Sequence, residues 1–467
     1  MTPSQYAPEE AISSIATALA PAALGIVRVS GKGCIELVSK VFSRPKALLE
    51  APGNTLVYGW IVDQDQKIDE VMLSVYRAPK SFTGEDMVEI SCHGGPAVVT
   101  AIQNLMLKSG FRQANRGEYT FRAYINGKTD LTKAEAVKEI IDSHTDTSRS
   151  HAAGRLAGSL FTEIDSIKQL IIDTLASIEV EIEYPEDEET IADTFDRADI
   201  ELAIKRLQSL VDSWQGEKLY QDGARVVLAG RTNAGKSSLF NAILKEERAI
   251  VSDIEGTTRD WLESWASING IPVRLFDTAG LRETSDQIEA QGVQLSRNLA
   301  QDADVVLYLV DSSLGLNDED KEFIKKCQEP LIIVWNKADK VGGQTPGGAG
   351  LEGNSFRGDE GNIPQVYISA KNGSGLKELY SQIYAILTAG LSSERQQAGL
   401  GSARQKEAVA EALESVKHAL VSADDNYTLD AVVQDLEDAI DSLGEVTGDV
   451  TPDDVLGSIF ANFCVGK

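Results

Sequence analysis

Short apolar patterns of two kinds divide the first 125 residues. Candidate strands cover residues 24–31, 57–62, 70–76 and 87–92, and candidate helices cover 36–42 and 97–109. The strands alternate between apolar and polar positions, and the helices repeat their apolar residues every three to four positions. A sharp turn, His93–Pro96, opens the second helix, and a lone histidine between a cysteine and two glycines is more often structural than catalytic. We predict a mixed α+β domain over residues 1–125.

Two further stretches have helical periodicity only. In the first, a capped start lies at 130–137 and amphipathic runs follow at 161–182 and 199–215. In the second, the runs are 406–422, 429–443 and 452–461. Because the two stretches flank a different pattern, the economical prediction is one discontinuous all-α domain, with halves at 126–218 and 389–467. The acidic run 185–189 is interpreted as a solvated turn and not as a metal site.

Residues 219–388 alternate between buried strand patterns and helical patterns. The strand candidates are 225–229, 261–268, 271–276, 305–311, 331–335 and 365–369. This alternation is typical of a mostly parallel sheet with helices on both faces, and Asn269-Gly270 indicates a hairpin. The Gly-rich, polar stretch 342–362 is expected to be a mobile surface insertion. The fold class predicted is multidomain α/β, with this domain inserted into the helical one.

Charge and cysteine content narrow the possible functions. The net charge is −28, from 44 basic and 72 acidic residues, which argues against a surface that binds nucleic acid throughout, although a local patch or a partner can still hold RNA. Scattered cysteines without metal spacing favour a reducing, cytoplasmic setting. A basic N-terminal region and an apolar run of about 20 residues are both missing from the sequence, so we expect neither a signal peptide nor membrane attachment.

The central chemical motif is Gly230–Ser237, which fits the phosphate-binding P-loop pattern between a strand and a helix. Its glycines allow the backbone to wrap a triphosphate, and its N–H groups and the following helix N-terminus point at the phosphates. Lys236 is expected to reach the β- and γ-phosphates, and the Ser237 hydroxyl is expected to bind Mg²⁺.

Later motifs select guanine over adenine and place the γ-phosphate sensors. In Asn336–Asp339, the carboxylate of Asp339 can accept two hydrogen bonds from guanine, a donor pair that adenine lacks. Ser369–Lys371 can pack beneath the base. Asp277–Gly280 and Gly256–Asp260 are expected near Mg²⁺ and the γ-phosphate. We therefore predict a GTP-binding, Ras-like P-loop domain.

Hydrolysis requires a positioned water molecule and neutralised charge. Many GTPases have glutamine directly after D-x-x-G, but Leu281 stands there and cannot orient water. Asn233 within the P-loop either helps to hold a monovalent cation or only shapes the loop; the residues alone leave both open.

Taken together, the sequence resembles the MnmE (TrmE) family of tRNA-modification GTPases along nearly its whole length. The resemblance is carried by the P-loop motifs and by segments at 25–31, 81–86, 93–96, 116–120 and 126–128, together with the ending Cys464-Val465-Gly466-Lys467. A prenylation box is the competing interpretation of Cys464, but Lys467 is not a usual final residue of one. Cys464 is either a packed terminal residue or a residue of the folate or active centre.

This resemblance implies three domains: a tetrahydrofolate-binding N-terminal domain that forms a homodimer, a helical domain and an inserted GTPase domain. It implies a K⁺-dependent GTPase that, with the FAD-dependent partner MnmG (GidA), adds a carboxymethylaminomethyl or similar aminomethyl-type group at C5 of the wobble uridine of certain tRNAs. The implied cofactors are GTP, Mg²⁺, K⁺ and a 5-formyl- or methylene-tetrahydrofolate. The tRNA is expected to bind mainly through the complex.

The resemblance also assigns site residues. GTP binding falls to Asn233, Ala234, Gly235, Lys236, Ser237, Ser238, Ser252, Asp253, Ile254, Glu255, Gly256, Thr257, Thr258, Asp277, Thr278, Ala279, Gly280, Asn336, Lys337, Ala338, Asp339, Ser369, Ala370 and Lys371. Ser237 and Thr258 match the Mg²⁺ ligands, and Asn233, Ser252, Ile254 and Thr257 the K⁺ site. Glu289 matches the water-orienting glutamate, with Arg282 as a second catalytic residue, and Arg28, Glu89, Lys128 and Lys467 match the folate contacts.

The chain departs from the family pattern at a few places. Residues 20–24 replace a glycine-rich turn, Arg404-Gln405 stands where an Arg-His pair is common, and Asp435 stands where arginine is common. Two other functions compete with the main one: a GTP-dependent binding module, for instance in ribosome assembly, and a folate enzyme regulated by GTP. The N-terminal domain and the C-terminal tail argue against the binding module.

Overall fold

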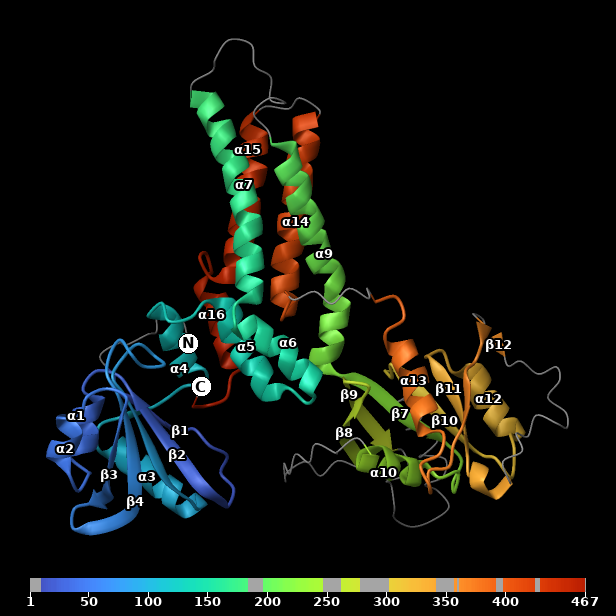
Figure 1. Cartoon of the computed structure of the whole chain (residues 1–467), viewed down its shortest axis with the longest axis horizontal. Coiled ribbons are helices and arrows are strands. Elements are labelled where there is room, and N and C mark those ends of the chain that lie inside the picture. Colours follow the sequence, from blue (N-terminus) through green and yellow to red (C-terminus); the bar gives the residue numbers. More distant parts are fainter. Residues whose placement is uncertain are drawn as a thin grey trace. The chain divides into compact units, whose positions relative to one another are not determined.

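A computed structural model describes residues 10–183, 196–246, 262–277, 302–341, 357–358, 361–391, 398–424 and 429–466 (Figure 1). The chain forms two compact units. The first comprises residues 1–138, 155–208 and 403–467, and the second comprises 139–154 and 209–402.

A mixed sheet forms the N-terminal part of the first unit, in the order β3-β4-β5-β2-β1-β6. Its strands are β1 (Ile12–Ile15), β2 (Ala22–Ser30), β3 (Thr55–Asp63), β4 (Gln66–Tyr76), β5 (Met87–Gly94) and β6 (Arg112–Gln113); its helices are α1 (Cys34–Ser39), α2 (Pro45–Leu49), α3 (Pro96–Lys108) and α4 (Glu118–Ile125). Helices α1 and α3 cover one face, where Ile35, Val38, Ile102 and Met106 join the buried core. Every strand predicted here from alternation is confirmed.

Strand β1 was missed because two of its residues are serines, which resemble a loop in the sequence. Both serines are fully buried. Ser13 donates to Gln103 at 2.8 Å and Ser14 to Tyr119 at 3.3 Å. These partners lie about a hundred residues away, so only tertiary contacts satisfy the serines. The first predicted helix also differs, because α1 begins at Cys34 and ends at Ser39.

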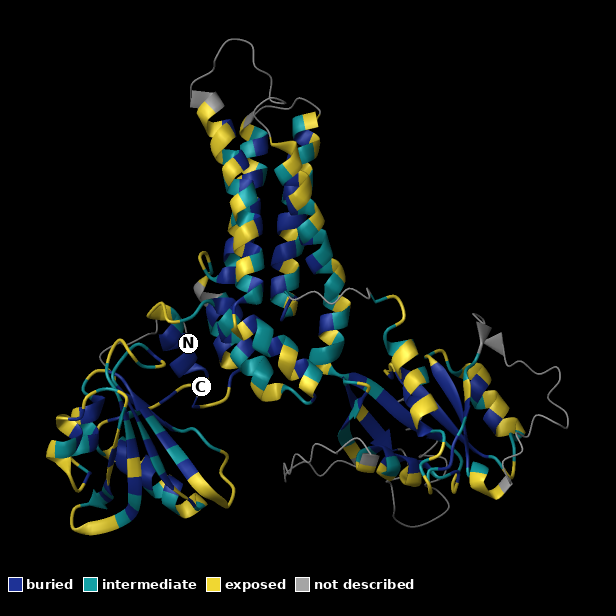
Figure 2. Ribbon diagram, in the orientation of Figure 1, coloured by how far each residue is buried: buried dark blue, intermediate teal, exposed yellow. Residues whose placement is uncertain are grey.

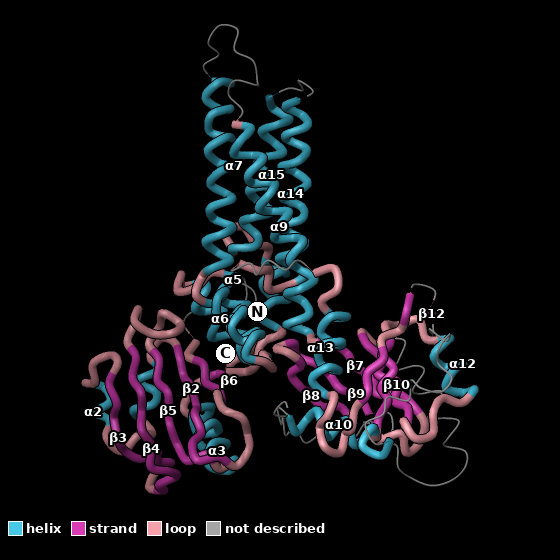
Figure 3. Tube along the Cα trace, turned by 45° about the vertical axis from the view of Figure 1, so that its right-hand side comes forward, coloured by secondary structure: helices cyan, strands magenta, loops and turns pink. Residues whose placement is uncertain are grey.

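The helical part of the first unit is built from segments that are distant in sequence. Helices α7 (Ser159–Glu183), α9 (Arg197–Asp222), α14 (Ala403–Asp424) and α15 (Leu429–Thr447) run side by side (Figures 1 and 3). Helix α15 packs along both α14 and α7. The predicted helical runs are confirmed, and α16 (Asp453–Ala461) closes the chain near α4, where the Phe121 and Phe460 rings meet edge-on at 5.3 Å.

The second unit is centred on a sheet in the order β14-β11-β10-β7-β9-β8. Its strands are β7 (Ala224–Gly230), β8 (Leu262–Ile268), β9 (Ile271–Asp277), β10 (Val305–Asp311), β11 (Leu331–Asn336) and β14 (Gln365–Tyr367). Only the β8–β9 pair is antiparallel, and its turn is Asn269-Gly270 as predicted. The central strands are buried on both faces, as Figure 2 shows, which explains their uninterrupted apolar sequences.

Within the described residues, helices α10 (Lys236–Glu246), α12 (Asp318–Lys326) and α13 (Leu376–Leu387) accompany this sheet. Within the stretch 342–362 the structure describes only the short pair β12 (Arg357–Gly358) and β13 (Gly361–Asn362). Of the residues described, none form a helix long and apolar enough to cross a membrane.

The second unit also contains the end of α5 (Leu131–Asp142), the start of α6 (Asp146–Leu156) and the last part of α9. The second unit therefore contains more of the chain than the domain predicted at residues 219–388. Helix α9 continues to Asp222, seven positions beyond the predicted run, and delivers the chain directly into β7.

Candidate active site

The P-loop backbone can be built only with glycine at two positions. Gly230 has φ 129°, and a Cβ there would lie 2.4 Å from the carbonyl oxygen of Leu309. Gly235 has φ 99°, and a Cβ there would lie 2.2 Å from Nδ2 of Asn336. Helix α10 starts directly afterwards at Lys236. The strand, loop and helix therefore have the arrangement that phosphate binding requires.

Lys236 occupies the centre of this loop. Its Nζ donates to the carbonyls of Gly230 at 2.7 Å and Arg231 at 2.9 Å. Burial lowers the pKa of Lys236, and the charge of Asp277 opposes that shift. The Lys236 ammonium group is desolvated and, among the described residues, has only neutral carbonyl acceptors. A phosphate group would supply the full negative charge that this ammonium lacks as a partner in the loop.

Asp277 ends β9 and lies beside β7, opposite Leu228. Its side chain is buried, whereas Ser237 in the first turn of α10 is exposed. A carboxylate whose charge acts on Lys236 and a hydroxyl at the start of α10 fit Mg²⁺, a hard cation that takes oxygen ligands and would neutralise phosphate charge. These two residues would hold it.

The guanine motif is attached to the P-loop by direct hydrogen bonds. Asn336 donates from Nδ2 to the carbonyl of Ala234 at 2.9 Å, and its Oδ1 accepts from the N–H of Ala370 at 3.1 Å. Asn336 thus joins the P-loop to the loop after β14. Three segments predicted from separate motifs meet at this one side chain.

Lys337 reinforces the same junction. It has φ 64°, and its Nζ donates to the carbonyl of Asn233 at 2.6 Å and to Oδ2 of Asp311 at 2.7 Å. Burial raises the pKa of Asp311, but hydrogen bonds from Lys337 and Ser313 outweigh it and lower the value to about 2. Asp311 therefore stays ionised and anchors the lysine.

Asp339 is positioned for base recognition. It is exposed, and the buried Ser369 donates to its Oδ1 at 2.7 Å, which lowers the pKa of Asp339. An ionised carboxylate at this place can accept from the two N–H groups of guanine. Lys371 is exposed beside this loop, and Ala338 donates its backbone N–H to Ile368 at 3.1 Å.

Part of the predicted site lies outside the described residues. This part comprises Ser252, Asp253, Ile254, Glu255, Gly256, Thr257, Thr258, Thr278, Ala279, Gly280, Leu281, Arg282, Glu289 and Lys467. Their assignments remain predictions. The acidic run 185–189 also lies outside the described residues.

The sequence analysis missed the role of Arg231 in holding the P-loop. Its Nε lies 3.2 Å from Oδ2 of Asp320, and it donates to the Gly315 carbonyl at 2.9 Å. Asp320 is buried in the first turn of α12 and also accepts from Tyr308 at 2.7 Å and from the Asn317 N–H at 2.9 Å. Arg231 therefore points to α12. The Asn317-x-x-Asp320 capping pattern was the available signal.

Two of the proposed folate residues, Arg28 of β2 and Glu89 of β5, lie in contact on the N-terminal sheet. Arg28 donates to Glu89 Oε1 from Nε at 3.0 Å and from Nη2 at 2.7 Å, and its Nη1 donates to the Gly466 carbonyl at 3.1 Å. The guanidinium lies 5.6 Å from both the Phe82 and Tyr119 ring centres. Lys128 donates to the carbonyl of Pro79 at 3.1 Å. Tyr119 is fully buried and Phe82 is exposed, so the charged pair and the Phe82 ring are the groups that fit a flat heterocycle offering both donors and acceptors.

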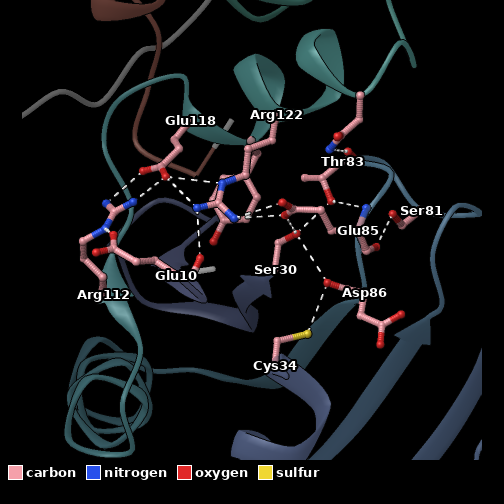
Figure 4. Close-up of polar contacts among 12 residues, drawn as sticks. Glu10, Ser30, Cys34, Ser81, Thr83, Glu85, Asp86, Arg112, Glu118 and Arg122 are labelled. Carbon is pink, nitrogen blue, oxygen red and sulfur yellow. Dashed lines mark hydrogen bonds and ion pairs between the residues drawn. The ribbon is translucent and has the colours of Figure 1, made fainter. Parts of the chain in front are cut away.

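A buried polar network supports the neighbouring loop 81–86 (Figure 4). Arg122 is fully buried and contacts Glu118 at 2.9 Å and Glu85 at 3.0 Å. Ser30 in turn contacts Thr83 at 2.8 Å and Glu85 at 3.0 Å. Because each buried charge has partners, this network fixes the loop that carries Phe82.

The remaining singled-out residues have plain structural surroundings. His93 is exposed and its Nδ1 lies 2.7 Å from Asp69. Cys464 is exposed. At the departures from the family pattern, Arg404 and Gln405 both contact Glu135, and Asp435 lies 2.6 Å from Nδ1 of His418.

The mostly parallel sheet, the P-loop and the guanine motif define a P-loop GTPase domain. Comparison with known proteins then assigns the whole chain, including the other two domains. The family model described as "MnmE helical domain" matches residues 131–464, and "GTP-binding protein TrmE N-terminus" matches 11–128. Proteins called tRNA modification GTPase MnmE from Treponema denticola and Treponema pallidum are 50% and 42% identical, each with 99% of both chains covered.

This chain belongs to the MnmE (TrmE) family of tRNA modification GTPases, and it is a GTP hydrolase that acts in tRNA modification. Among solved structures, Era in complex with MgGDPNP and nucleotides 1506–1542 of 16S ribosomal RNA matches 41% of this chain and 66% of its own, at 26% identity and a TM-score of 0.29.

Proposed function

We propose that this protein hydrolyses GTP in a K⁺-dependent cycle and, with the FAD-dependent partner MnmG, adds a carboxymethylaminomethyl or similar aminomethyl-type group at C5 of the wobble uridine of certain tRNAs. The one-carbon unit comes from a tetrahydrofolate derivative. The observation that carries the proposal is the identity of 50% to a tRNA modification GTPase over 99% of both chains. We expect the reaction to take place in the cytoplasm.

The P-loop supports K⁺ dependence through Asn233. This residue is exposed and has φ 61°, a left-handed conformation that Lys337 stabilises by binding its carbonyl. The side chain of Asn233 is therefore exposed on a loop whose backbone is held in place. An amide oxygen is a suitable ligand for a monovalent cation beside the phosphates.

The N-terminal sheet supports folate binding through residues from both ends of the chain. Arg28 and Gly466 are separated by 438 positions and meet at 3.1 Å. The C-terminal tail is therefore built into this site, with Val465 bridged to Arg116.

The same sheet supports a homodimer. Its outer face exposes Leu24, Leu56, Tyr58 and Met72, and Tyr58 and Met72 are direct cross-strand partners. The opposite face is covered by α1 and α3. An apolar open sheet face of this kind fits a second copy of the chain. We expect the wild type to be a dimer by light scattering, and Met72→Glu to be largely monomeric.

The decisive experiment is deletion of the gene followed by nucleoside mass spectrometry of total tRNA. We expect the modified wobble nucleoside to disappear and to return with the wild-type gene. Lys236→Ala and Arg28→Ala should each fail to restore it, whereas Lys108→Ala, on the exposed end of α3, should restore it fully. Persistence of the modified nucleoside after deletion would overturn the proposal.

A further inference from the structure

Residues 139–154, here called the α5–α6 corner, pack against the hairpin formed by β8 and β9. The corner contains the end of α5, a short turn and the start of α6. It belongs to the same compact unit as the nucleotide site. The hairpin links the corner to the nucleotide site, because β9 pairs with the P-loop strand β7 and ends at Asp277.

The first contact is an aromatic stack. The His144 ring lies on the Trp265 ring of β8 with centres 3.8 Å apart and planes 20° from parallel. The Arg274 guanidinium lies 4.8 Å from the Trp265 ring centre. Gly223 abuts the indole so closely that a Cβ there would lie 2.5 Å from it. Trp265 is therefore held by three separate elements.

The second contact fixes the hairpin's turn. Thr145 is buried, and its hydroxyl donates to the Gly270 carbonyl at 3.0 Å. A Cβ on Gly270, which has φ 89°, would lie 2.7 Å from the Thr147 hydroxyl, so the turn and the corner fit without a gap. Ile268 and Ile271 pair directly beside this turn, so the β8–β9 ladder is continuous up to the turn that the corner holds.

The third contact attaches the corner to the end of α9. The Ser148 hydroxyl donates to the Tyr220 carbonyl at 2.6 Å, and the His151 ring meets the Tyr220 ring at 4.9 Å. His151 Nδ1 also lies 3.2 Å from Glu217. The corner therefore contacts both the β8–β9 hairpin and α9, the helix that leads into the P-loop strand β7.

Both helices of the corner are longer than the corner itself. Helix α5 begins at Leu131 and α6 ends at Leu156, so each helix extends beyond residues 139–154. The paired hairpin, its tip held by the corner, and the two helices that leave the corner form a continuous path along which movement can be transmitted.

We propose that the α5–α6 corner is a clamp that carries nucleotide-dependent movement of the β8–β9 hairpin into α5 and α6, with His144 and Thr145 as its positioning residues. Binding of a γ-phosphate changes the charge beside Lys236 and Asp277, and β9 moves with Asp277. The clamp then displaces the corner, because the hairpin cannot bend between Asp277 and Gly270 without breaking its ladder.

Hydrogen–deuterium exchange on the full-length protein tests this clamp. We compare Mg²⁺-GDP with Mg²⁺ and a non-hydrolysable GTP analogue, and expect the exchange rate of peptides covering 139–154 to differ at least about threefold between the two. The double variant His144→Ala, Thr145→Val should lose this difference and keep the nucleotide-dependent difference in peptides covering 230–246.

Two controls separate the clamp from general loosening. His144→Phe keeps a ring on Trp265 and should retain the difference, as should His418→Ala, which removes a histidine–aspartate pair from the helical part. If the double variant fails to bind GDP, Thr145→Val and Trp265→Leu, measured singly, decide by the same criterion. An unchanged corner in the wild type, or a full response in the double variant, would overturn the proposal.

Discussion

Lys337 of the guanine motif binds the backbone carbonyl of Asn233 in the P-loop at 2.6 Å. The same ammonium binds Asp311 at the end of β10 at 2.7 Å. One side chain therefore holds three loops at the carboxyl edge of the sheet, where ligands bind in open α/β folds. Base recognition and the P-loop are consequently one structural element in this protein.

Replacing Lys337 should weaken GTP binding while leaving the fold intact. In Lys337→Met the carbonyl of Asn233 and the carboxylate of Asp311 lose a charged donor, which costs about 1.5–3 kcal/mol. We expect the Kd for GTP to rise roughly 10- to 100-fold, measured by titration calorimetry. The neighbouring Lys340→Met, whose residue is exposed, should leave the Kd unchanged. Equal effects of the two variants would contradict the role assigned to Lys337.

Asp339 should decide which base is bound. Asp339→Asn replaces two acceptor oxygens by one acceptor and one donor group, which suits xanthine, where a carbonyl replaces the amino group of guanine. We expect the preference to change from GTP to XTP by at least about 100-fold, measured by competition binding. Ser369→Ala should lower GTP affinity by about tenfold or less, because it removes one hydrogen bond to Asp339. A variant that still prefers GTP would show that recognition lies elsewhere.

Hydrolysis should be faster in K⁺ than in Na⁺ at equal ionic strength. Asn233→Ala removes the proposed cation ligand, so the response to K⁺ should disappear while GTP affinity remains measurable. Thr232→Ala, at the adjacent exposed position, is the matched control and should keep the response. The response to K⁺ is measured as the rate of steady-state phosphate release in the two salts. Equal wild-type rates in K⁺ and Na⁺ would show that the cation has no role in the mechanism.

Glu289 should act in hydrolysis and not in binding. Leu281 leaves the usual water-orienting position without a polar group, so Glu289→Ala should lower kcat by about 100-fold or more with an unchanged Kd. Glu289→Gln should be impaired to a smaller extent if the side chain mainly orients the water. A wild-type rate in Glu289→Ala would assign the water to another residue.

The His144–Trp265 stack should make stability depend on pH on the acid side of neutrality. Burial and the nearby Arg274 lower the pKa of His144, and Asp142 opposes them. Because the folded protein disfavours the protonated ring, the contribution of His144 to stability is complete above its unfolded pKa of about 6.5. It is lost as the pH falls through the lower folded pKa.

Melting curves between pH 7 and pH 5 check this effect. The wild type should lose more stability over this interval than His144→Phe, which has no titrating group at that position. His418→Phe serves as the control, because its histidine belongs to α14 and contacts Asp435 of α15. Parallel pH profiles for wild type and His144→Phe would show that the ring does not titrate within the stack.

Local sequence was sufficient wherever a feature depends on neighbouring residues. The P-loop was readable because Gly230 and Gly235 need conformations and space that only glycine has. The hairpin was readable because Asn269-Gly270 supplies two consecutive residues with positive φ. Long amphipathic helices were also predicted, since one apolar face repeats at a regular interval. The family followed from motifs in a set order.

Tertiary structure alone decided which distant residues meet. Arg28 reaches Gly466, Arg231 turns to Asp320, and His144 stacks on Trp265, because folding brings separate segments into contact. The serines of β1 resemble loop residues in the sequence, and only the fold supplies their hydrogen-bond partners, Gln103 and Tyr119. Periodicity records which face of an element is buried but not what covers it. The partners of polar side chains therefore had to come from the fold.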